Sequence, residues 1–423
     1  MRKPNPALDP AAAESTWASL VTSSPQRRTF QCQTITPLFG GGVTARTVDE
    51  LLPVRPSSIR GQLRHWWRLL KMGPDSRQLF REECGIWGGI RAQGPTASKV
   101  RVRVHDIDQA GSKLVDAFEY KRVGATYKST PHVHPGMSAY ALFSAQGQLS
   151  DDRTRLETSP SKIATHGIRF KLDIECPEEC WEQVHQALRW WASFGGLGSR
   201  TRRGLGAVRV EGLTPVTEDE VQATGGLLAL RRSSDSGMAA WNEAIGRLQE
   251  FRQGVGVGRN PGKESNRPGR SRWPEADMIR RLVQPQPQKG WAHEPEHSVQ
   301  DLYPRAAFGL PIVFHFQGKP EPADHTLEPD NAATDSASER LASPLILRPY
   351  WDGQNYVPAA LLIPGWKKAL QLQLEFRGTR HTALQVWPND EQEGKRRAGQ
   401  IKPMQGRGND PLTAFMQFFM ENH

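Results

Sequence analysis

The chain has 423 residues, and its 55 Lys and Arg against 45 Asp and Glu give a formal net charge of +10. This length predicts two or three domains, each able to fold around a core without disulfides. No apolar run approaches the roughly 18 residues of a membrane span, and residues 1–13 lack the apolar core of a signal peptide. Four cysteines in so long a chain are typical of reduced thiols. We therefore expect a cytoplasmic protein whose basic surface binds a polyanion, such as nucleic acid.

The first half shows a regular order of elements. Residues 1–26 are rich in Pro, Ala and Ser and are expected to form a flexible N-terminal extension. Periodicity then predicts a strand at 29–38, a helix from Ser57 to Gly73, strands at 99–105 and 168–174, a helix at 177–194 and a short strand at 207–210. Residues 106–166 look like a long irregular insertion. This strand–helix–strand–strand–helix–strand order is that of a ferredoxin-like domain, which we place at residues 27–215.

The second half, residues 216–423, is predicted to be a second, more divergent α+β domain whose strand order the sequence does not give. Strands are expected at 227–231, 307–316, 345–350, 357–362 and 370–376, and helices at 237–252 and 411–420. Loops are expected at 254–269, 284–297 and 321–339, where Gly, Pro and polar residues predominate.

The most informative segment is residues 195–206, which hold five glycines and three arginines after the second predicted helix. Glycine lets a backbone approach a ligand closely, and guanidinium groups match the geometry of phosphate. No Gly-Lys-Ser/Thr follows, and the segment leaves a helix rather than opening one, so it is not a nucleotide P-loop. An ordinary connection with solvated arginines is the alternative. We expect a flexible, cationic rim that contacts phosphate through Gly195, Gly196, Gly198, Arg200, Arg202, Arg203 and Gly204.

A basic stripe on the first predicted helix is the second feature. Arg60 and Arg64 recur there at helical spacing, and Gly40, Gly41 and Gly42 lie just upstream. Together these residues could extend a positive surface, although a solvated helix face explains the stripe equally well. Trp66 and Trp67, on the same helix, are expected in the core rather than under a nucleobase.

No metal, cofactor or catalytic residue is predicted. Cys176 and Cys180 have no second pair at zinc-finger spacing, and His132 and His134 are two near neighbours in a loop. The twelve histidines are scattered, and none lies in a nucleophile motif.

Five segments resemble a known family. Residues 35–42, 56–64 and 195–204 look like the RAMP superfamily, the repeat-associated RNA-binding proteins of CRISPR systems. Residues 269–277 and 304–311 look more narrowly like the subunit-one family of the type III-B Cmr effector complex. The resemblance implies two tandem ferredoxin-like (RRM-like) RAMP domains with long loop insertions. A degenerate second copy of the glycine-rich loop is expected at 394–399 with 406–408.

The resemblance also implies partners: guide RNA, target RNA and the other Cmr subunits. In that family the subunit helps hold the 3′ region of the guide and engage target RNA, while backbone subunits cut the target. We predict a non-catalytic ribonucleoprotein subunit for antiviral defence, with Arg270, Arg272 and Arg280 as further RNA contacts. Two alternatives stay open: an endoribonuclease that matures guide RNA through His65 or His166, and a scaffold that touches only protein.

Overall fold

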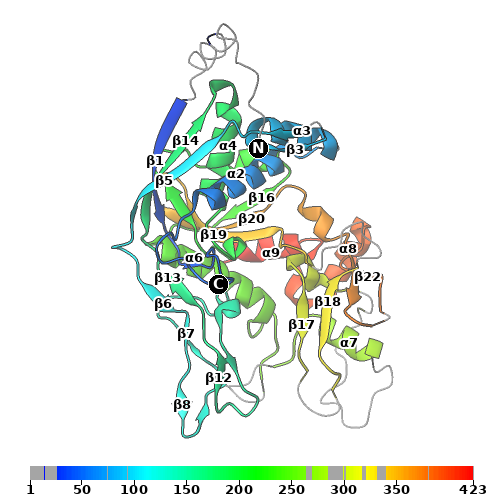
Figure 1. The fold of residues 1–423 in the computed structure, drawn as a ribbon. Coiled ribbons are helices and arrows are strands. Elements are labelled where there is room, and N and C mark those ends of the chain that lie inside the picture. Colours follow the sequence, from blue (N-terminus) through cyan, green and yellow to red (C-terminus); the bar gives the residue numbers. More distant parts are fainter. Residues whose placement is uncertain are drawn as a thin grey trace, which may run out of the picture.

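The computed structural model describes residues 26–73, 75–92, 94–262, 269–283, 302–316, 321–330, 340–379 and 381–422, with Glu14 and Val299 (Figure 1). Apart from Glu14 and Gln26, the expected N-terminal extension lies outside the described residues, as does the expected loop at 284–297. Helices and antiparallel sheets are mixed along the chain, in agreement with the predicted α+β class.

The first half is built on a four-stranded antiparallel sheet with the strand order β15-β1-β14-β5. Its elements are β1 (Gln26–Thr34), α2 (Pro56–Lys71), β5 (Arg101–Asp108), β14 (Arg169–Cys176), α4 (Glu178–Phe194) and β15 (Val208–Val210). The predicted succession of elements is therefore confirmed, with the last strand beside the first. Phe170 and Leu172 alternate with polar residues along β14, so one face of the sheet packs against Leu63 and Leu188 of the two helices.

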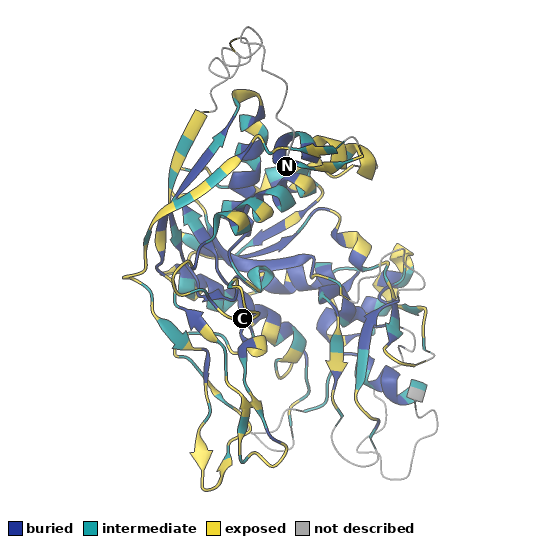
Figure 2. Ribbon diagram, in the orientation of Figure 1, coloured by how far each residue is buried: buried dark blue, intermediate teal, exposed yellow. Residues whose placement is uncertain are grey.

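The insertion between β5 and β14 is present, but it is not irregular. It forms short strands and one 3₁₀ turn: β6 (Leu114–Asp116), β7 (Phe118–Glu119), β8 (Arg122–Val123), β9 (Thr126–Tyr127), β10 (His132–Val133), η1 (Phe143–Ala145), β11 (Gln148–Leu149), β12 (Leu156–Thr158) and β13 (Lys162–Ala164). These hairpins project from the body at the lower left of Figure 1, and much of their surface is exposed in Figure 2. Three further elements precede them: α3 (Ser76–Trp87), β3 (Gly89–Arg91) and β4 (Gly94–Thr96).

The second half repeats part of this plan. Strands β16 (Leu227–Leu230), β19 (Leu345–Trp351) and β20 (Tyr356–Leu362) form an antiparallel sheet in the order β16-β20-β19. Helix α6 (Gly237–Gln253) packs on β19 and β20, and α9 (Pro411–Met420) packs on α6 and β16. The succession is strand–helix–strand–strand–helix, and the third strand again lies between the first and the second. Among the described residues no fourth strand pairs with β16.

The rest of the second half forms a lateral lobe, at the lower right of Figure 1. It contains α7 (Glu275–Val283), η3 (Pro304–Phe308), β17 (Ile312–Phe314), β18 (His325–Pro329), β21 (Gln373–Phe376), β22 (Leu384–Gln385) and α8 (Glu391–Ala398). The strand expected at 307–316 is therefore shorter and follows a 3₁₀ turn. The second glycine-rich loop expected at 394–399 is wrong, because Asp390 caps the backbone N–H of Glu393 and opens α8 through that segment.

The two halves share a buried boundary. Strands β19 and β20 are buried on both faces (Figure 2). Leu345 and Leu347 belong to the core around α6, whereas Ile346 and Tyr350 belong to the core of the first half. The ring of Tyr350 stacks on Phe194 of α4, with 5.8 Å between the ring centroids. The second sheet is therefore packed between the helices of both halves, and this boundary positions the glycine-rich loop.

Candidate nucleic-acid interface

The glycine-rich loop, residues 195–206, runs from α4 to β15 along the boundary between the halves. Gly198, Arg200, Gly204 and Gly206 have φ between 59° and 73°, a region that glycine occupies without strain. Leu197 N donates to Gly206 O at 2.8 Å, and Gly206 N donates to the carbonyl oxygen of Pro37 at 2.8 Å. The loop that we expected to be flexible is therefore fixed by backbone hydrogen bonds.

The structure brings the two predicted glycine segments together. Ser199 N donates to Phe39 O at 2.6 Å, just before Gly40. A Cβ on Gly41 would lie 3.1 Å from the Cα of Gly198, so these backbones touch directly. The close packing of the two backbones is by itself a sufficient reason for glycine at this crossing. Whether Gly40–Gly42 and the loop glycines also contact RNA stays a prediction.

The three loop arginines point in different directions. Arg203 donates to Phe308 O and to Leu345 O, both at 3.2 Å. Arg202 donates to Ser343 O. Arg200 lies toward the projecting hairpins, with its Nη1 3.5 Å from Ser144 Oγ. Arg203 in particular fastens the loop to the second half instead of reaching into solvent, and Arg200 is the arginine of the three nearest the insertion.

Within the described part of the chain, these arginines have no acidic partner. Burial lowers the pKa of Arg200 and Arg202 and lowers that of Arg203 to about 10. The groups that act on Arg200 and Arg203 are the Tyr140 phenol, Arg252 and the neighbouring loop arginines. Arg252 itself donates to the Tyr140 hydroxyl at 3.3 Å. We call Arg200, Arg202, Arg203 and Arg252, together with His65, the junction cluster. Its four guanidinium groups have no carboxylate partner among the described residues, and a partly desolvated group of cations favours a polyanion.

His65 on α2 responds to this field. Burial, together with the positive charges of Arg202 and Arg68, lowers its pKa to about 4, and no carboxylate among the described residues opposes them. The imidazole is therefore neutral at physiological pH, and a buried ring of so low a pKa is poorly placed as the base of a ribonuclease.

This pKa predicts acid sensitivity. The unfolded chain takes up a proton on His65 below pH 6.5, and the folded chain does so only near pH 4. The contribution of neutral His65 to the free energy of unfolding is thus complete above pH 6.5 and decreases as the pH falls. At pH 5 the free energy of unfolding is about 2 kcal/mol lower for this reason. Urea unfolding at pH 7, 6 and 5 should show a shallower pH dependence for His65→Gln than for the native chain. His132→Gln, in an exposed hairpin, is the control, and equal slopes for His65→Gln and the native chain would contradict the assignment.

The arginines predicted on α2 are engaged within the molecule. Arg60 Nη2 donates to Trp87 O at 2.6 Å. Arg64 donates from Nε and Nη2 to the buried carboxylate of Glu83, at 2.9 and 2.7 Å. Both side chains fasten α3 to α2, and their contact with RNA stays a prediction.

Two of the three arginines predicted in the second half lie beside acids. Arg280 pairs with Asp277 at 3.0 Å and with Glu321 at 2.8 Å, and Arg270 lies 3.6 Å from Asp277. Arg272 donates from Nε to the side-chain oxygen of Asn260 at 2.7 Å. The carboxylates offset the positive charge here, so this group differs from the junction cluster.

On the polar face of the first sheet, carboxylates offset part of the positive charge. Arg101 and Arg103 of β5 lie 3.1 and 3.9 Å from the carboxylate of Glu175 on β14. His105 Nε2 lies 3.2 Å from Asp173, and the hydrogen bond to this carboxylate is the largest influence raising the pKa of His105. The basic residues of this face therefore share nearby carboxylates, in contrast to the arginines of the junction cluster, and these carboxylates weaken the attraction for phosphate.

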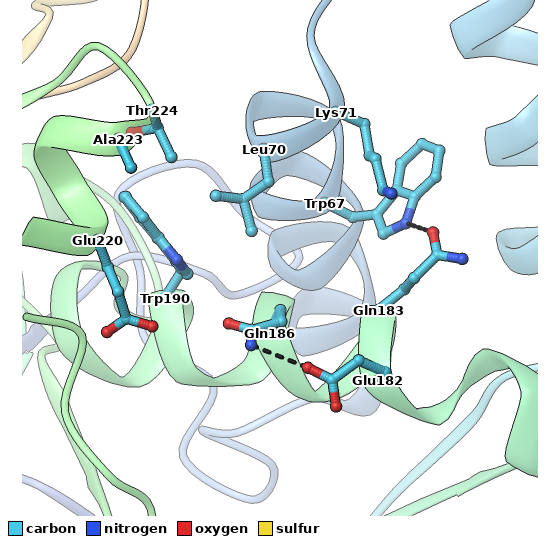
Figure 3. Close-up of a pocket in the computed structure, with 10 residues that line it drawn as sticks. All are labelled: Trp67, Leu70, Lys71, Glu182, Gln183, Gln186, Trp190, Glu220, Ala223 and Thr224. Atoms are coloured by element: carbon cyan, nitrogen blue, oxygen red, sulfur yellow. Dashed lines mark hydrogen bonds between the residues drawn. The ribbon is translucent and has the colours of Figure 1, made fainter.

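A cavity of about 380 Å³ opens between α2, α4 and α5 (Glu218–Ala223), as Figure 3 shows. Trp67, Leu70 and Trp190 supply apolar walls, and Glu182 and Glu220 lie among the lining residues. The two carboxylates oppose binding of an RNA backbone there. Trp66 and Trp67 are each 1% exposed, so the prediction that they belong to the core is confirmed.

The cysteines remain free thiols. Burial raises the pKa of Cys176 to about 11 and also raises that of Cys180. Within the described part of the chain, no three His, Cys, Asp or Glu side chains gather as metal ligands would. Across the same residues, no helix combines the length and apolar character needed to cross a bilayer.

Sequence reasoning missed several neighbours of the loop. Arg252 and Tyr140 contact the junction cluster from α6 and from the insertion. Arg46 donates to Gln146 O at 2.8 Å and ties the segment after Gly42 to the insertion. The positions of Tyr140 and Phe143 in a polar insertion were a signal, because aromatic side chains in such a segment need either a core or a ligand.

Part of the chain matches the model of a known protein family. Residues 31–209, which include the end of β1, helices α2 and α4 and the glycine-rich loop, match the family model of the RAMP superfamily. The RAMP match confirms the resemblance predicted from the glycine-rich segments. The CRISPR system Cmr subunit Cmr1-2 of Pyrococcus furiosus is 26% identical over 192 residues, which are 43% of this chain and 94% of that protein.

Solved structures of Cmr proteins are also similar to this chain. The apo form of Cmr1 from Pyrococcus furiosus has a TM-score of 0.43 and 14% identity, over 80% of this chain and 88% of that one. A chain of the type III-B Cmr-beta complex bound to cognate target RNA has a TM-score of 0.41 and 9% identity, over 94% of this chain and 100% of that one.

Proposed function

We propose that the chain is a non-catalytic RNA-binding subunit of a type III-B CRISPR interference complex, which helps hold the 3′ region of the guide RNA and engage target RNA in antiviral defence. The RAMP match of residues 31–209 and the similarity to Cmr1-2 support this assignment. In the proposal its partners are guide RNA, target RNA and other Cmr subunits, in the cytoplasm.

The junction cluster is the observation that carries the proposal. Its arginines are held by carbonyl, hydroxyl and phenol oxygens, so they keep their full positive charge in a partly buried place. Elsewhere, on the sheet face and around Asp277, arginines lie beside carboxylates. Phosphate groups would supply the missing negative charge, and such contacts tolerate any base sequence, as a guide-based complex requires.

The proposed fold is two tandem ferredoxin-like RAMP domains, at residues 27–215 and 216–423. The strand order β15-β1-β14-β5 supports the first of them. The order β16-β20-β19, with α6 and α9 packed on that sheet, supports the second, without its fourth strand in the described residues. In this arrangement the glycine-rich loop of the first domain faces the second sheet.

Substitution of Arg200 tests the function. Arg200→Gln is expected to weaken binding of single-stranded RNA roughly ten- to hundredfold, because a hydrogen bond to a charged group contributes about 1.5–3 kcal/mol. The slope of log affinity against log salt should fall by about 0.7, the value for one single-strand phosphate contact. Fluorescence anisotropy with labelled RNA at several salt concentrations measures both quantities. Arg101→Gln, whose side chain pairs with Glu175 on the sheet face, is the matched control.

Three results would reject the proposal. Unchanged affinity and slope in Arg200→Gln would favour a scaffold that touches only protein. A loss of RNA affinity in Arg101→Gln but not in Arg200→Gln would place RNA on the sheet face. Cleavage of repeat RNA by the purified chain, abolished by His166→Ala, would make the protein an enzyme.

A further inference from the structure

Phe143 is the most exposed aromatic side chain among the described residues that bear Phe, Tyr or Trp. Its side chain is 68% exposed, and Phe80 follows at 46%. An exposed ring of this size leaves apolar surface in contact with water. Burying that surface would be favourable by roughly 25 cal/mol for each Å². A ring kept outside the core at a fixed place suggests a ligand that covers it.

The ring is held in place by its neighbours. Phe143 begins the 3₁₀ turn η1. Leu142, which precedes the turn, and Ala145, which ends it, are both fully buried. Ala145 N donates to Leu142 O at 2.7 Å, and Ser161 N donates to Ala145 O at 2.9 Å. The backbone of Phe143 is thus fixed between buried anchors, so covering the ring costs little backbone entropy.

Two arginines contact residues next to Phe143 in the chain. Ser144, the next residue, has its Oγ 3.5 Å from Nη1 of Arg200. The carbonyl oxygen of Gln146 accepts a hydrogen bond from Arg46 Nη2 at 2.8 Å, and Arg46 is itself exposed. One turn earlier, Tyr140 accepts from Arg252 of the junction cluster. An exposed ring whose neighbours in the chain bind guanidinium groups offers the combination that proteins use for single-stranded nucleic acid, an aromatic surface beside positive charge.

We propose that Phe143 is a base-stacking platform: an unpaired RNA base lies on its ring while the phosphates on either side contact Arg200 and Arg46. This inference rests on the proposed function and specifies how the RNA is bound. Stacking accepts every base because each has a π-face, so the platform does not read sequence. It also requires single-stranded or unstacked RNA, because a base within a duplex does not offer its face.

Binding of single-stranded RNA to the full chain tests the platform. Phe143→Ala should weaken binding roughly five- to hundredfold, since stacking contributes about 1–3 kcal/mol for each base. The salt slope should stay at the native value, because no phosphate contact is lost. Phe143→Tyr and Phe143→Trp keep an aromatic ring, so their affinity for RNA should lie within about twofold of the native value. Phe80→Ala, at the other exposed ring, should bind as the native chain does. With 2-aminopurine in the RNA, the native chain and Phe143→Trp should quench its fluorescence more than Phe143→Ala.

The outcomes separate this inference from the proposed function. If Arg200→Gln weakens RNA binding while Phe143→Ala binds normally, the platform is rejected and the function stands. If the native chain binds no RNA, both are rejected. A loss of affinity in Phe143→Ala accompanied by a smaller salt slope would mean that the substitution displaces Arg200 or Arg46, and this also rejects stacking. Circular dichroism of each variant checks that the fold is intact.

Discussion

Glu275→Ala is expected to lower the free energy of unfolding by about 3–5 kcal/mol, the cost of leaving one member of a buried ion pair without its partner. Glu275 is fully buried at the start of α7. Its carboxylate accepts from the backbone N–H of Arg305 at 2.7 Å and from Arg305 Nε at 2.9 Å. The substitution therefore leaves both a buried amide and a guanidinium unsatisfied. The urea midpoint, followed by tryptophan fluorescence, measures the loss.

This pair connects distant parts of the chain to the candidate site. Glu275 and Arg305 belong to the two segments that resemble the Cmr subunit-one family. Arg305 is the second residue of the turn η3, whose last residue, Phe308, offers its carbonyl oxygen to Arg203. The pair thus stabilises the turn that receives the glycine-rich loop.

Two variants check the interpretation. Glu275→Gln keeps an acceptor for the Arg305 amide but loses the charge. Its free energy of unfolding should therefore lie between that of the native chain and that of Glu275→Ala. Glu178→Ala removes an exposed ion pair with Arg28 and should change stability little. A native urea midpoint in Glu275→Ala would show that the pair contributes nothing.

Elements with strong periodicity could be predicted from the sequence. The helix expected at 177–194 is observed as Glu178–Phe194, and the helix at 411–420 has the expected bounds. Helix α3 was missed, because its apolar residues are few and a Gly-Pro pair precedes it. Its N-cap, Asp75, accepts from the backbone N–H groups of Arg77 and Gln78, and this capping pattern was the available signal.

The candidate site was predictable in location but not in geometry. The glycine and arginine content of residues 195–206 marked the loop, because few other functions require that composition. The orientation of Arg203 could not be predicted, since its acceptors are the carbonyl oxygens of Phe308 and Leu345, far along the chain. Backbone carbonyls are present at every residue and leave no mark in a sequence.

Gly206→Ala is the second substitution with a large expected effect, a loss of about 4 kcal/mol in the free energy of unfolding. Gly206 has φ of +63°, where alanine is strained by about 1–3 kcal/mol. A Cβ there would also overlap the carbonyl oxygen of Leu197. That backbone cannot retreat easily, because Leu197 N donates to Gly206 O at 2.8 Å. Overpacking of this kind adds about 1–3 kcal/mol.

Gly212→Ala separates the two causes of this loss. Gly212 has φ of +76°, but a Cβ there would meet no atom within 4 Å. It should therefore show only the strain of positive φ, about 1 kcal/mol. Because Gly206 fixes the loop that carries Arg200 and Arg202, Gly206→Ala should also weaken RNA binding under conditions where the chain remains folded, whereas Gly212→Ala should not. Equal urea midpoints for the two variants would mean that the crossing at Leu197 relaxes freely, and the rigid loop on which the junction cluster depends would have to be abandoned.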